Sequence, residues 1–348
     1  MTPEWPKPDW ECEGARLYCG DAAAVLPTLP AASVQCVVTS PPYWGLRDYG
    51  VAGQLGLEPT PEEYVAKLVA VFREVRRVLR GDGTVWINMG DSYCSQPAGN
   101  IAPSGFSQTR PSRRKHGVGP ETVDLPGKRF DDLKSKDLCG IPWRVAFALQ
   151  ADGWWLRQDI IWHKPNPMPE SVTDRCTKAH EYIFLLAKSA KYHCDMEAVK
   201  EAADGDTHSR GTKRTPPIER AGIGHKDWCW YMTRDNQITG RNRRSVWTVT
   251  TKPYPQAHFA TYPPELIEPC VKAGCPTGGI VLDPYVGSGT TLQVALEQGC
   301  QAIGIELNRG YLPMIRERLG PVVARLDQER RQERFDFGGP ARPDNREQ

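Results

Sequence analysis

The strongest constraint on the fold is a short segment near the end of the chain, in which an apolar run leads to an acid and two closely spaced glycines. Residues 280–291 read IVLDPYVGSGTT, which predicts a buried strand, a tight turn and the start of a helix. A turn of this kind directs backbone N–H groups at a ligand beyond the carboxyl end of the strand. The segment therefore predicts a parallel sheet with a binding site at its edge.

Strand and helix patterns alternate on both sides of this segment, which indicates an α/β fold with a mainly parallel sheet. Apolar residues at helical spacing predict a long helix over 59–80, and the glycines at 81 and 83 predict its end. The other strands are predicted at 15–21, 34–40, 84–89, 154–163, 179–187, 280–284 and 302–307. The other helices are predicted at 22–29, 138–149, 264–273, 290–298 and 311–319.

Composition excludes several classes of protein. No apolar run approaches the ~20 residues that a membrane-spanning helix needs, and the first ten residues lack the basic and apolar parts of a secretory leader. The eleven cysteines include no C-x-x-C pair, so we expect reduced thiols and neither a disulfide framework nor a metal site.

The turn after residue 283 differs from the two phosphate-binding loops that it superficially matches. No lysine follows Gly289, as a triphosphate-binding loop requires, and Leu292 stands where a dinucleotide fingerprint has its third glycine. A second acid, Glu306, ends the next predicted strand about twenty residues later, where a carboxylate can accept both hydroxyls of a ribose. Asp283 is available to an amino group. This set favours a ligand with a ribose, an ammonium group and no phosphate, a description that S-adenosylmethionine fits.

A second turn, TSPPY at residues 39–43, follows an apolar strand pattern near the start of the chain. Two consecutive prolines fix a stiff, non-helical turn and leave their carbonyls without a local N–H donor. A rigid carbonyl and the Ser40 hydroxyl can accept hydrogen bonds from an exocyclic amine, and Tyr43 offers a face on which a flat base can stack.

The two turns, in this order, resemble those of the amino-group DNA methyltransferases, which methylate cytosine N4 or adenine N6. The catalytic turn near the start and the cofactor turn near the end are similar to the circularly permuted β group. The resemblance extends over about residues 15–190 and 250–320, and it implies a Rossmann-like methyltransferase fold that uses S-adenosyl-L-methionine. Further agreement is found in YCGD at 18–21, residues 83–91, WHKPNPMP at 162–169, AHFATYPPEL at 257–266 and GIELN at 304–308.

The resemblance also implies roles for individual residues. The target-base pocket would consist of Ser40, Pro41, Pro42 and Tyr43. The cofactor would be held by Asp21 near its adenine, Phe259 and Thr261 closing over it, and Asp283, Pro284, Tyr285, Gly287, Ser288, Gly289, Thr290, Glu306 and Asn308.

The first position of the catalytic turn bears on the identity of the target base. Within the family, enzymes with Ser at this position resemble those that methylate cytosine N4, whereas Asp or Asn is usual in those that methylate adenine N6. Ser40 therefore favours cytosine N4, with adenine N6 as the alternative. A covalent C5-cytosine route through Cys270, which follows Pro269, is rejected because this pair lies in an apolar helical pattern.

Residues 205–252 form a basic region punctuated by Trp and Tyr. This region holds ten Lys or Arg and four acids, an excess of +6 in a chain whose net charge is +2. Positive charge suits phosphates, and arginine forks can read guanine edges. The DNA-binding residues predicted here are Arg210, Lys213, Arg214, Arg241, Arg243 and Arg244, and a second loop adds Arg113, Arg114 and Lys115.

The resemblance implies one catalytic domain in two pieces. We predict a catalytic half at 11–191 with a mobile loop at 92–137, a target-recognition region at 192–252, a cofactor-binding half at 253–320 and a charged, partly disordered tail at 321–348. Double-stranded DNA is the expected partner, in the cytoplasm of a prokaryote or in a phage system, close to the nucleoid. A cognate restriction endonuclease and a second copy of the chain are further candidate partners. A catalytically silent DNA-binding protein and an RNA methyltransferase of similar fold are the remaining alternatives.

Overall fold

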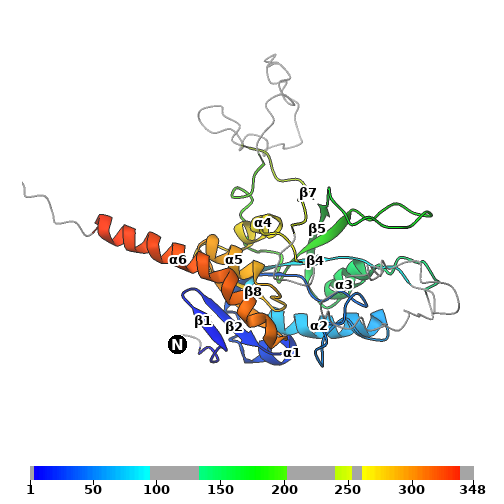
Figure 1. Ribbon diagram of the computed structural model, residues 1–348, viewed down its shortest axis with the longest axis horizontal. Helices are drawn as coiled ribbons and strands as arrows, with labels where there is room; N and C mark the ends of the chain where they lie inside the picture. The colour runs from blue at the N-terminus through cyan, green and yellow to red at the C-terminus, as the bar shows by residue number, and fades with distance from the viewer. Residues whose placement is uncertain (1–3, 95–132, 202–239, 253–260, 338–348) are drawn as a thin grey trace, which may run out of the picture.

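A nine-stranded sheet organises the chain in the computed structural model, which describes residues 4–94, 133–201, 240–252 and 261–337 (Figure 1). The strands are β1 (Trp10–Cys12), β2 (Ala15–Cys19), β3 (Val34–Thr39), β4 (Leu79–Met89), β5 (Trp155–His163), β6 (His180–Ala187), β7 (Val246–Thr248), β8 (Ile280–Asp283) and β9 (Gln301–Glu306). The helices are α1 (Ala22–Val25), α2 (Pro61–Val78), α3 (Ile141–Ala151), α4 (Pro264–Gly274), α5 (Thr290–Glu297) and α6 (Leu312–Phe337), with short 3-10 helices at Leu26–Thr28 and Arg309–Tyr311.

The strand order is β1-β2-β9-β8-β3-β4-β6-β5-β7. The strands from β2 to β4 in this order are parallel to one another, whereas β6 is antiparallel to both of its neighbours. Strands β8 and β9 come late in the sequence but lie between β2 and β3, so both ends of the chain build one sheet. The predicted α/β class, mainly parallel sheet and Rossmann-like fold are confirmed.

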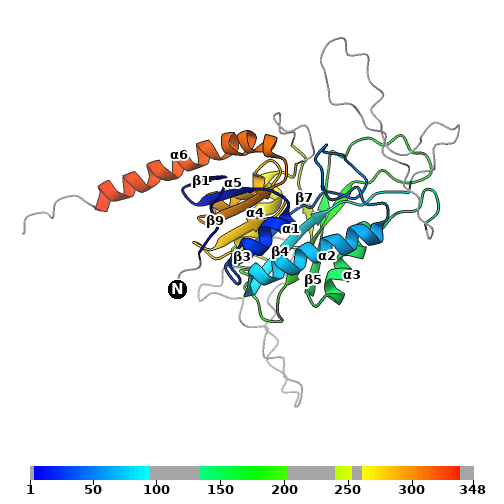
Figure 2. The same cartoon turned by 90° about the horizontal axis from the view of Figure 1, so that it is seen from below.

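Two hydrophobic cores lie on opposite faces of the sheet (Figure 2). Helices α1, α2 and α3 pack on one face, and α4, α5 and α6 pack on the other. Neighbouring strand residues alternate between the faces, as the pleat requires: Val37 joins the first core, and Cys36 and Val38 join the second. A sheet buried on both faces explains why its parallel strands read as continuous apolar runs.

The junction between α2 and β4 differs from the prediction. Helix α2 begins with an N-cap, in which Thr60 Oγ1 accepts a hydrogen bond from Glu63 N at 3.2 Å. The glycines at 81 and 83 were expected to separate the helix from a strand at 84, but β4 begins at Leu79, directly after α2. The register with β3 shifts in this stretch, so the glycines occupy an irregularity inside the strand and not a loop before it.

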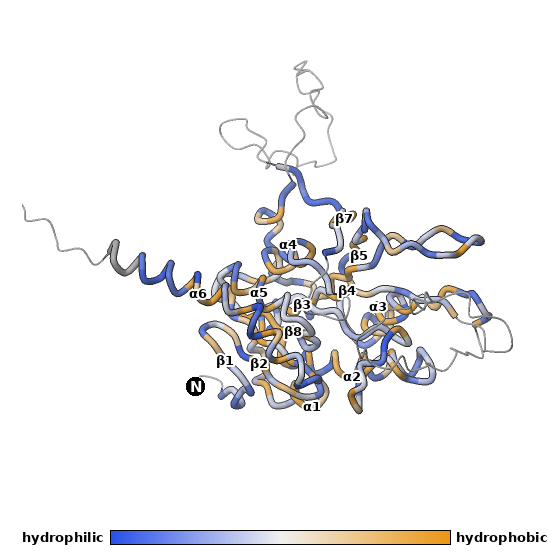
Figure 3. The backbone as a smooth tube through the Cα atoms, viewed as in Figure 1, coloured by the Kyte–Doolittle hydropathy of each residue, from blue (hydrophilic) through white to orange (hydrophobic). Residues whose placement is uncertain are grey.

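The two ends of the sheet also extend beyond the predictions, whereas the last helix continues into the charged tail, as the sequence predicts. Strands β1 and β7, of three residues each, were not predicted, and β7 pairs with β5 although it lies in the region predicted for target recognition. Helix α6 continues past residue 319 to Phe337, and its outer part is hydrophilic and projects from the body (Figures 1 and 3). In the described part of the chain, no helix is both long and apolar enough to cross a membrane.

Candidate active site

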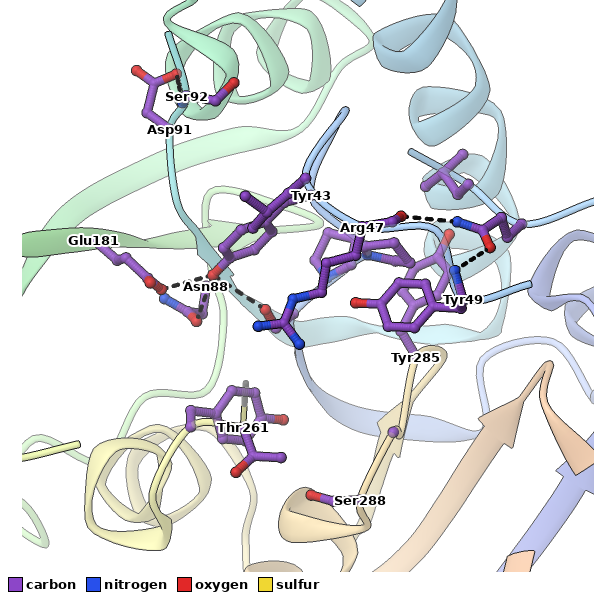
Figure 4. A pocket seen from close by; sticks show the side chains of 18 of the residues that line it. Tyr43, Arg47, Tyr49, Asn88, Asp91, Ser92, Glu181, Thr261, Tyr285 and Ser288 are labelled. Atoms are coloured by element: carbon purple, nitrogen blue, oxygen red, sulfur yellow. Dashed lines mark hydrogen bonds between the residues drawn. The ribbon is translucent and has the colours of Figure 1, made fainter. Parts of the chain in front are cut away.

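A large pocket opens at the carboxyl edge of the sheet, where β8 and β3 are neighbours. Helix α5, which follows β8, and helix α2, which follows β3, pack on opposite faces, so the chain diverges here and leaves a crevice. The pocket has a volume of about 1700 Å³, and side chains converge on it from several elements (Figure 4). Both predicted turns meet at this crevice, because Thr39 Oγ1 donates a hydrogen bond to Asp283 Oδ1 at 2.6 Å.

Asp283 is fully buried, and its carboxylate accepts four hydrogen bonds from the protein. Oδ1 accepts from Thr39 Oγ1 at 2.6 Å and from Tyr285 N at 3.0 Å. Oδ2 accepts from Thr291 Oγ1 at 2.5 Å and from Tyr262 Oη at 3.1 Å. Burial raises the pKa of Asp283, and these donors oppose the rise. The carboxylate fixes the turn from behind and does not line the pocket, and its contact with an amino group stays a prediction.

The turn after β8 depends on two glycines and on a second buried acid. Gly287 and Gly289 have φ of 53° and 83°, and a Cβ at 289 would lie 3.0 Å from Ile315 Cγ2. Glu306, at the end of β9, accepts hydrogen bonds from Gly287 N at 2.9 Å and from Asn308 N at 2.8 Å. Burial raises the pKa of Glu306 to about 7, and the two N–H groups oppose this rise. Backbone donors therefore hold a carboxylate at the pocket wall.

The turn after β3 leaves hydrogen-bond acceptors facing the pocket. The Pro42 carbonyl already accepts from Tyr64 Oη at 2.9 Å, whereas the Pro41 carbonyl has no donor among the described residues. Ser40 Oγ lies 3.5 Å from Tyr43 Oη, which is long for a hydrogen bond. Ser40, Pro41 and Tyr43 all line the pocket, so acceptors stand beside an aromatic ring, as the sequence predicts.

The Tyr43 ring is held at its hydroxyl and along its edge (Figure 4). The hydroxyl donates to Glu181 Oε2 at 2.7 Å and lies 3.1 Å from Asn88 Oδ1, and Lys164 Nζ donates to the other oxygen of Glu181. A Cβ on Gly90 would lie 2.7 Å from Tyr43 Cε2, so only glycine fits there. Burial raises the pKa of Tyr43 well above its usual value, and the Glu181 charge adds to this, so the phenol stays protonated.

Most of the other predicted cofactor residues also line the pocket: Asp21, Thr261, Pro284, Tyr285, Ser288, Thr290 and Asn308. Asp21 is also the N-cap of α1, since its Oδ1 accepts a hydrogen bond from Ala23 N at 3.0 Å. Gly289 is not in the lining and acts instead at the start of α5. Phe259 lies outside the described residues.

Three of the predicted DNA-binding arginines are described, and each contacts a neighbouring side chain, although Arg244 stays largely exposed. Arg241 Nε and Arg244 Nε lie 3.2 and 3.0 Å from Glu201 Oε2, and the Arg243 guanidinium lies 4.7 Å from the centre of the Trp247 ring. The other predicted residues lie outside the described part of the chain: Arg113, Arg114, Lys115, Arg210, Lys213 and Arg214.

Sequence reasoning missed several polar residues that shape the pocket. Asn88 and Glu181 lie within apolar stretches of β4 and β6, and Lys164 directly follows β5. A polar side chain within an apolar strand must be paired when it is buried, and this is the signal that could have identified Asn88 and Glu181. Thr39, Thr291 and Tyr262, which hold Asp283, gave no such signal.

Cys270, the nucleophile of the rejected C5 route, lies inside α4 and is fully buried in the second core. Burial raises its pKa well above the usual value for a thiol. A protonated thiol in a core is not a nucleophile, so the structure agrees with the rejection.

Comparisons with known proteins agree with this geometry. A model of the family N6_N4_Mtase, described as DNA methylase, matches residues 34–317. Type II methyltransferase M.XycI of Xanthomonas campestris pv. cyanopsidis is 48% identical over 306 residues, which is 88% of each chain. Type II methyltransferase M.Cfr9I of Citrobacter freundii is 47% identical over 309 residues, which is 89% of each chain.

Solved structures share the fold. The PvuII DNA methyltransferase (cytosine-N4-specific) aligns with a TM-score of 0.57 and 17% identity, over 92% of this chain and 94% of that chain. A candidate DNA modification methylase from Thermus thermophilus, solved with S-adenosyl-L-methionine, aligns with a TM-score of 0.51 and 26% identity, over 88% of this chain and 95% of that chain.

Proposed function

Because the chain belongs to the DNA methylase family N6_N4_Mtase, it is an S-adenosyl-L-methionine-dependent DNA amino-methyltransferase of the type II restriction-modification class, and we propose that it methylates cytosine N4. The observation that carries this choice is Ser40 at the first position of the catalytic turn, with its hydroxyl at the pocket. Enzymes of this family that act on adenine N6 usually have Asp or Asn at that position.

The pocket residues fit S-adenosyl-L-methionine. Glu306 has two carboxylate oxygens at the pocket wall and can accept the two ribose hydroxyls. The turn at 287–289 would face the methionine part, and Asp21 would lie near the adenine. The volume of about 1700 Å³ exceeds the roughly 300–1,000 Å³ of ordinary small-molecule sites, so a base can enter beside the cofactor. When bound, the cofactor supplies an electrophilic methyl group.

We assign orientation of the target amine to Ser40 and Pro41. Conjugation with the ring makes an exocyclic amine a poor nucleophile, and acceptors on its two N–H bonds favour a pyramidal nitrogen with an available lone pair. Ser40 Oγ and the Pro41 carbonyl are the acceptors that the turn offers. The methylated ammonium is strongly acidic, so positioning and hydrogen bonds supply most of the catalysis and no strong base is required.

The target base must leave the duplex to reach this turn. The ring of Tyr43 would stack on the flipped base and so replace part of the stacking energy that the base loses in the duplex.

The basic region at 205–252 would contact DNA together with the loop at 92–137. The chain would then consist of the catalytic half, target-recognition region, cofactor-binding half and tail that the sequence predicts. We further propose a cognate endonuclease as a functional partner, a homodimer as the assembly, and bacterial chromosomal DNA in the cytoplasm as the substrate.

Nucleoside analysis tests the choice of base. The full chain is incubated with methyl-labelled cofactor and unmethylated genomic DNA from several sources of contrasting base composition, and the digested DNA is analysed by mass spectrometry. N4-methylcytosine is expected, and a Ser40→Ala, Tyr43→Ala double variant should abolish it. N6-methyladenine would replace the proposal with the adenine alternative. Cofactor binding without any methylated base would indicate a silent DNA-binding protein.

A further inference from the structure

Arg47 places a guanidinium group in the pocket without an internal partner. The side chain is half-buried and lines the pocket, yet it has no hydrogen bond or ion pair with any residue that the structure describes. Its acidic neighbour Asp48 accepts a hydrogen bond from Gly50 N at 2.7 Å instead. A half-buried cation that the protein leaves unpaired indicates a site for an anionic group.

The loop that carries Arg47 is built to hold it in place. Trp44 is buried and donates from Nε1 to the Glu58 carbonyl at 2.9 Å, which closes the loop at its base. The Gln54 side chain bridges the tip, since it donates to the Arg47 carbonyl at 3.1 Å and accepts from Tyr49 N at 2.7 Å. The backbone of Arg47 is therefore fixed while its guanidinium remains available.

The guanidinium lies at the cofactor half of the pocket. Burial raises the pKa of Tyr49 and of Tyr311, and in both groups the Glu306 charge adds to the rise while Arg47 opposes it. Arg47 is therefore close to the phenol groups of Tyr49 and Tyr311, whose pKa values are also raised by the charge of Glu306. Figure 4 shows its side chain reaching into the pocket between Tyr43 and Tyr49 and facing Thr261 and Ser288, two of the predicted cofactor residues, across the pocket.

We propose that Arg47 binds the carboxylate of the methionine part of S-adenosyl-L-methionine. The cofactor carries one anionic group, and a planar guanidinium matches a carboxylate with two parallel hydrogen bonds. The turn at 287–289, assigned above to the methionine part, lies at the same pocket. A DNA phosphate is the less favoured anion, because a flipped base enters the pocket while its phosphates remain on the strand outside. The inference rests on the proposed cofactor site.

Calorimetry with two ligands that differ only in the carboxylate tests this role. The wild-type chain and Arg47→Gln are titrated, without DNA, with S-adenosylmethionine and with decarboxylated S-adenosylmethionine. Arg47→Gln should bind the first ligand about 10- to 100-fold more weakly, the effect of losing a charged hydrogen bond, and should bind the second as the wild type does. Arg175→Gln is the matched control, because Arg175 also lines the pocket but is paired with Glu170, and it should leave both affinities unchanged.

Two results would overturn the proposal. Equal losses for both ligands would show that Arg47 only maintains the shape of the pocket. Unchanged cofactor affinity together with a raised KM for DNA would show that it binds a phosphate. Neither outcome depends on which base is methylated, so this test and the nucleoside analysis can fail separately, and a wild type that binds neither ligand would refute the cofactor site itself.

Discussion

At the scale of single residues, the most informative group is the Glu306 carboxylate. Its pKa of about 7 lies above the ~4.3 of an exposed Glu, so the folded protein holds the proton more tightly than the unfolded chain does. Ionised Glu306 therefore destabilises the fold by roughly 4 kcal/mol above pH 7, a penalty that disappears as pH falls below about 4. Hydroxyl donors of a ribose would stabilise the charged form, so ligand binding can relieve this penalty.

The first prediction concerns the pH dependence of cofactor affinity. If the ionised form of Glu306 accepts the ribose hydroxyls, affinity should be constant above about pH 7.5 and fall by up to tenfold per pH unit below 7. Glu306→Gln should bind weakly, with no such fall between pH 8 and 6. Calorimetric titrations across this range measure both profiles. A wild-type affinity that does not change with pH would contradict the role of the ionised carboxylate.

The two turns should separate in their kinetic effects. Ser40→Ala removes an acceptor for the target amine, so kcat should fall about 100-fold while cofactor affinity changes little. Asp283→Ala should do the reverse, because it removes the acceptor that shapes the cofactor turn. Asp283→Ala also leaves four buried donors without an acceptor and can therefore unfold the protein. Asp283→Asn keeps one carbonyl acceptor and is the variant expected to stay folded, with a cofactor affinity about tenfold lower than that of the wild type. Similar losses of cofactor affinity in the Ser40 and Asp283 variants would refute the assignment.

Gly90 tests whether the Tyr43 ring must stay where it is. A Cβ at this position would lie 2.7 Å from Tyr43 Cε2, so Gly90→Ala should displace the ring and lower DNA-dependent turnover at least tenfold, with cofactor affinity retained. Gly81→Ala, within β4, is the matched control, because a Cβ there meets nothing within 4 Å. Steady-state kinetics measures turnover and calorimetry measures cofactor affinity for both variants. Equal turnover of Gly90→Ala and Gly81→Ala would contradict the requirement for a fixed Tyr43 ring.

At the scale of elements, the success of sequence reasoning depended on the length of the pattern. Helix α2 was predicted to within two residues of its ends because its apolar stripe is long. Strands β1 and β7 are too short for a pattern and exist because a neighbouring strand pairs with them. The predicted start of β4 at residue 84 was wrong, because glycines that can end a helix can also occupy an irregularity within a strand.

In the candidate site, the residues that could be predicted are those that lie next to one another in the sequence. Both turns were found because each carries its chemistry in a few adjacent residues. The Tyr43–Glu181 hydrogen bond joins positions 138 residues apart and follows from the pairing of β4 with β6, which no local pattern encodes. Arg47 was missed because it looks like an ordinary surface residue until the loop around it closes.

At the scale of the whole molecule, the near-neutral net charge conceals an uneven distribution. The +6 excess of residues 205–252 leaves −4 for the remainder of the chain. If this region contacts about six phosphates, raising the salt from 50 to 200 mM should weaken DNA binding by about 10³-fold. Fluorescence anisotropy with a duplex measures this dependence, and cofactor affinity serves as the salt-insensitive control. A loss of less than tenfold would show that the basic region does not bind the backbone.

The chain enters and leaves residues 202–239 at nearly the same point. Glu201 and Arg241 exchange backbone hydrogen bonds of 3.0 and 2.9 Å, and their side chains pair as well. A segment whose ends are joined can be exchanged for another of different length at little entropic cost, since loop closure depends only weakly on length. If residues 202–239 recognise the DNA sequence, as proposed above, the chemistry of the sheet edge and the choice of target can evolve independently. A relative's segment grafted between Glu201 and Arg241 should then change the target site while leaving the cofactor affinity unchanged.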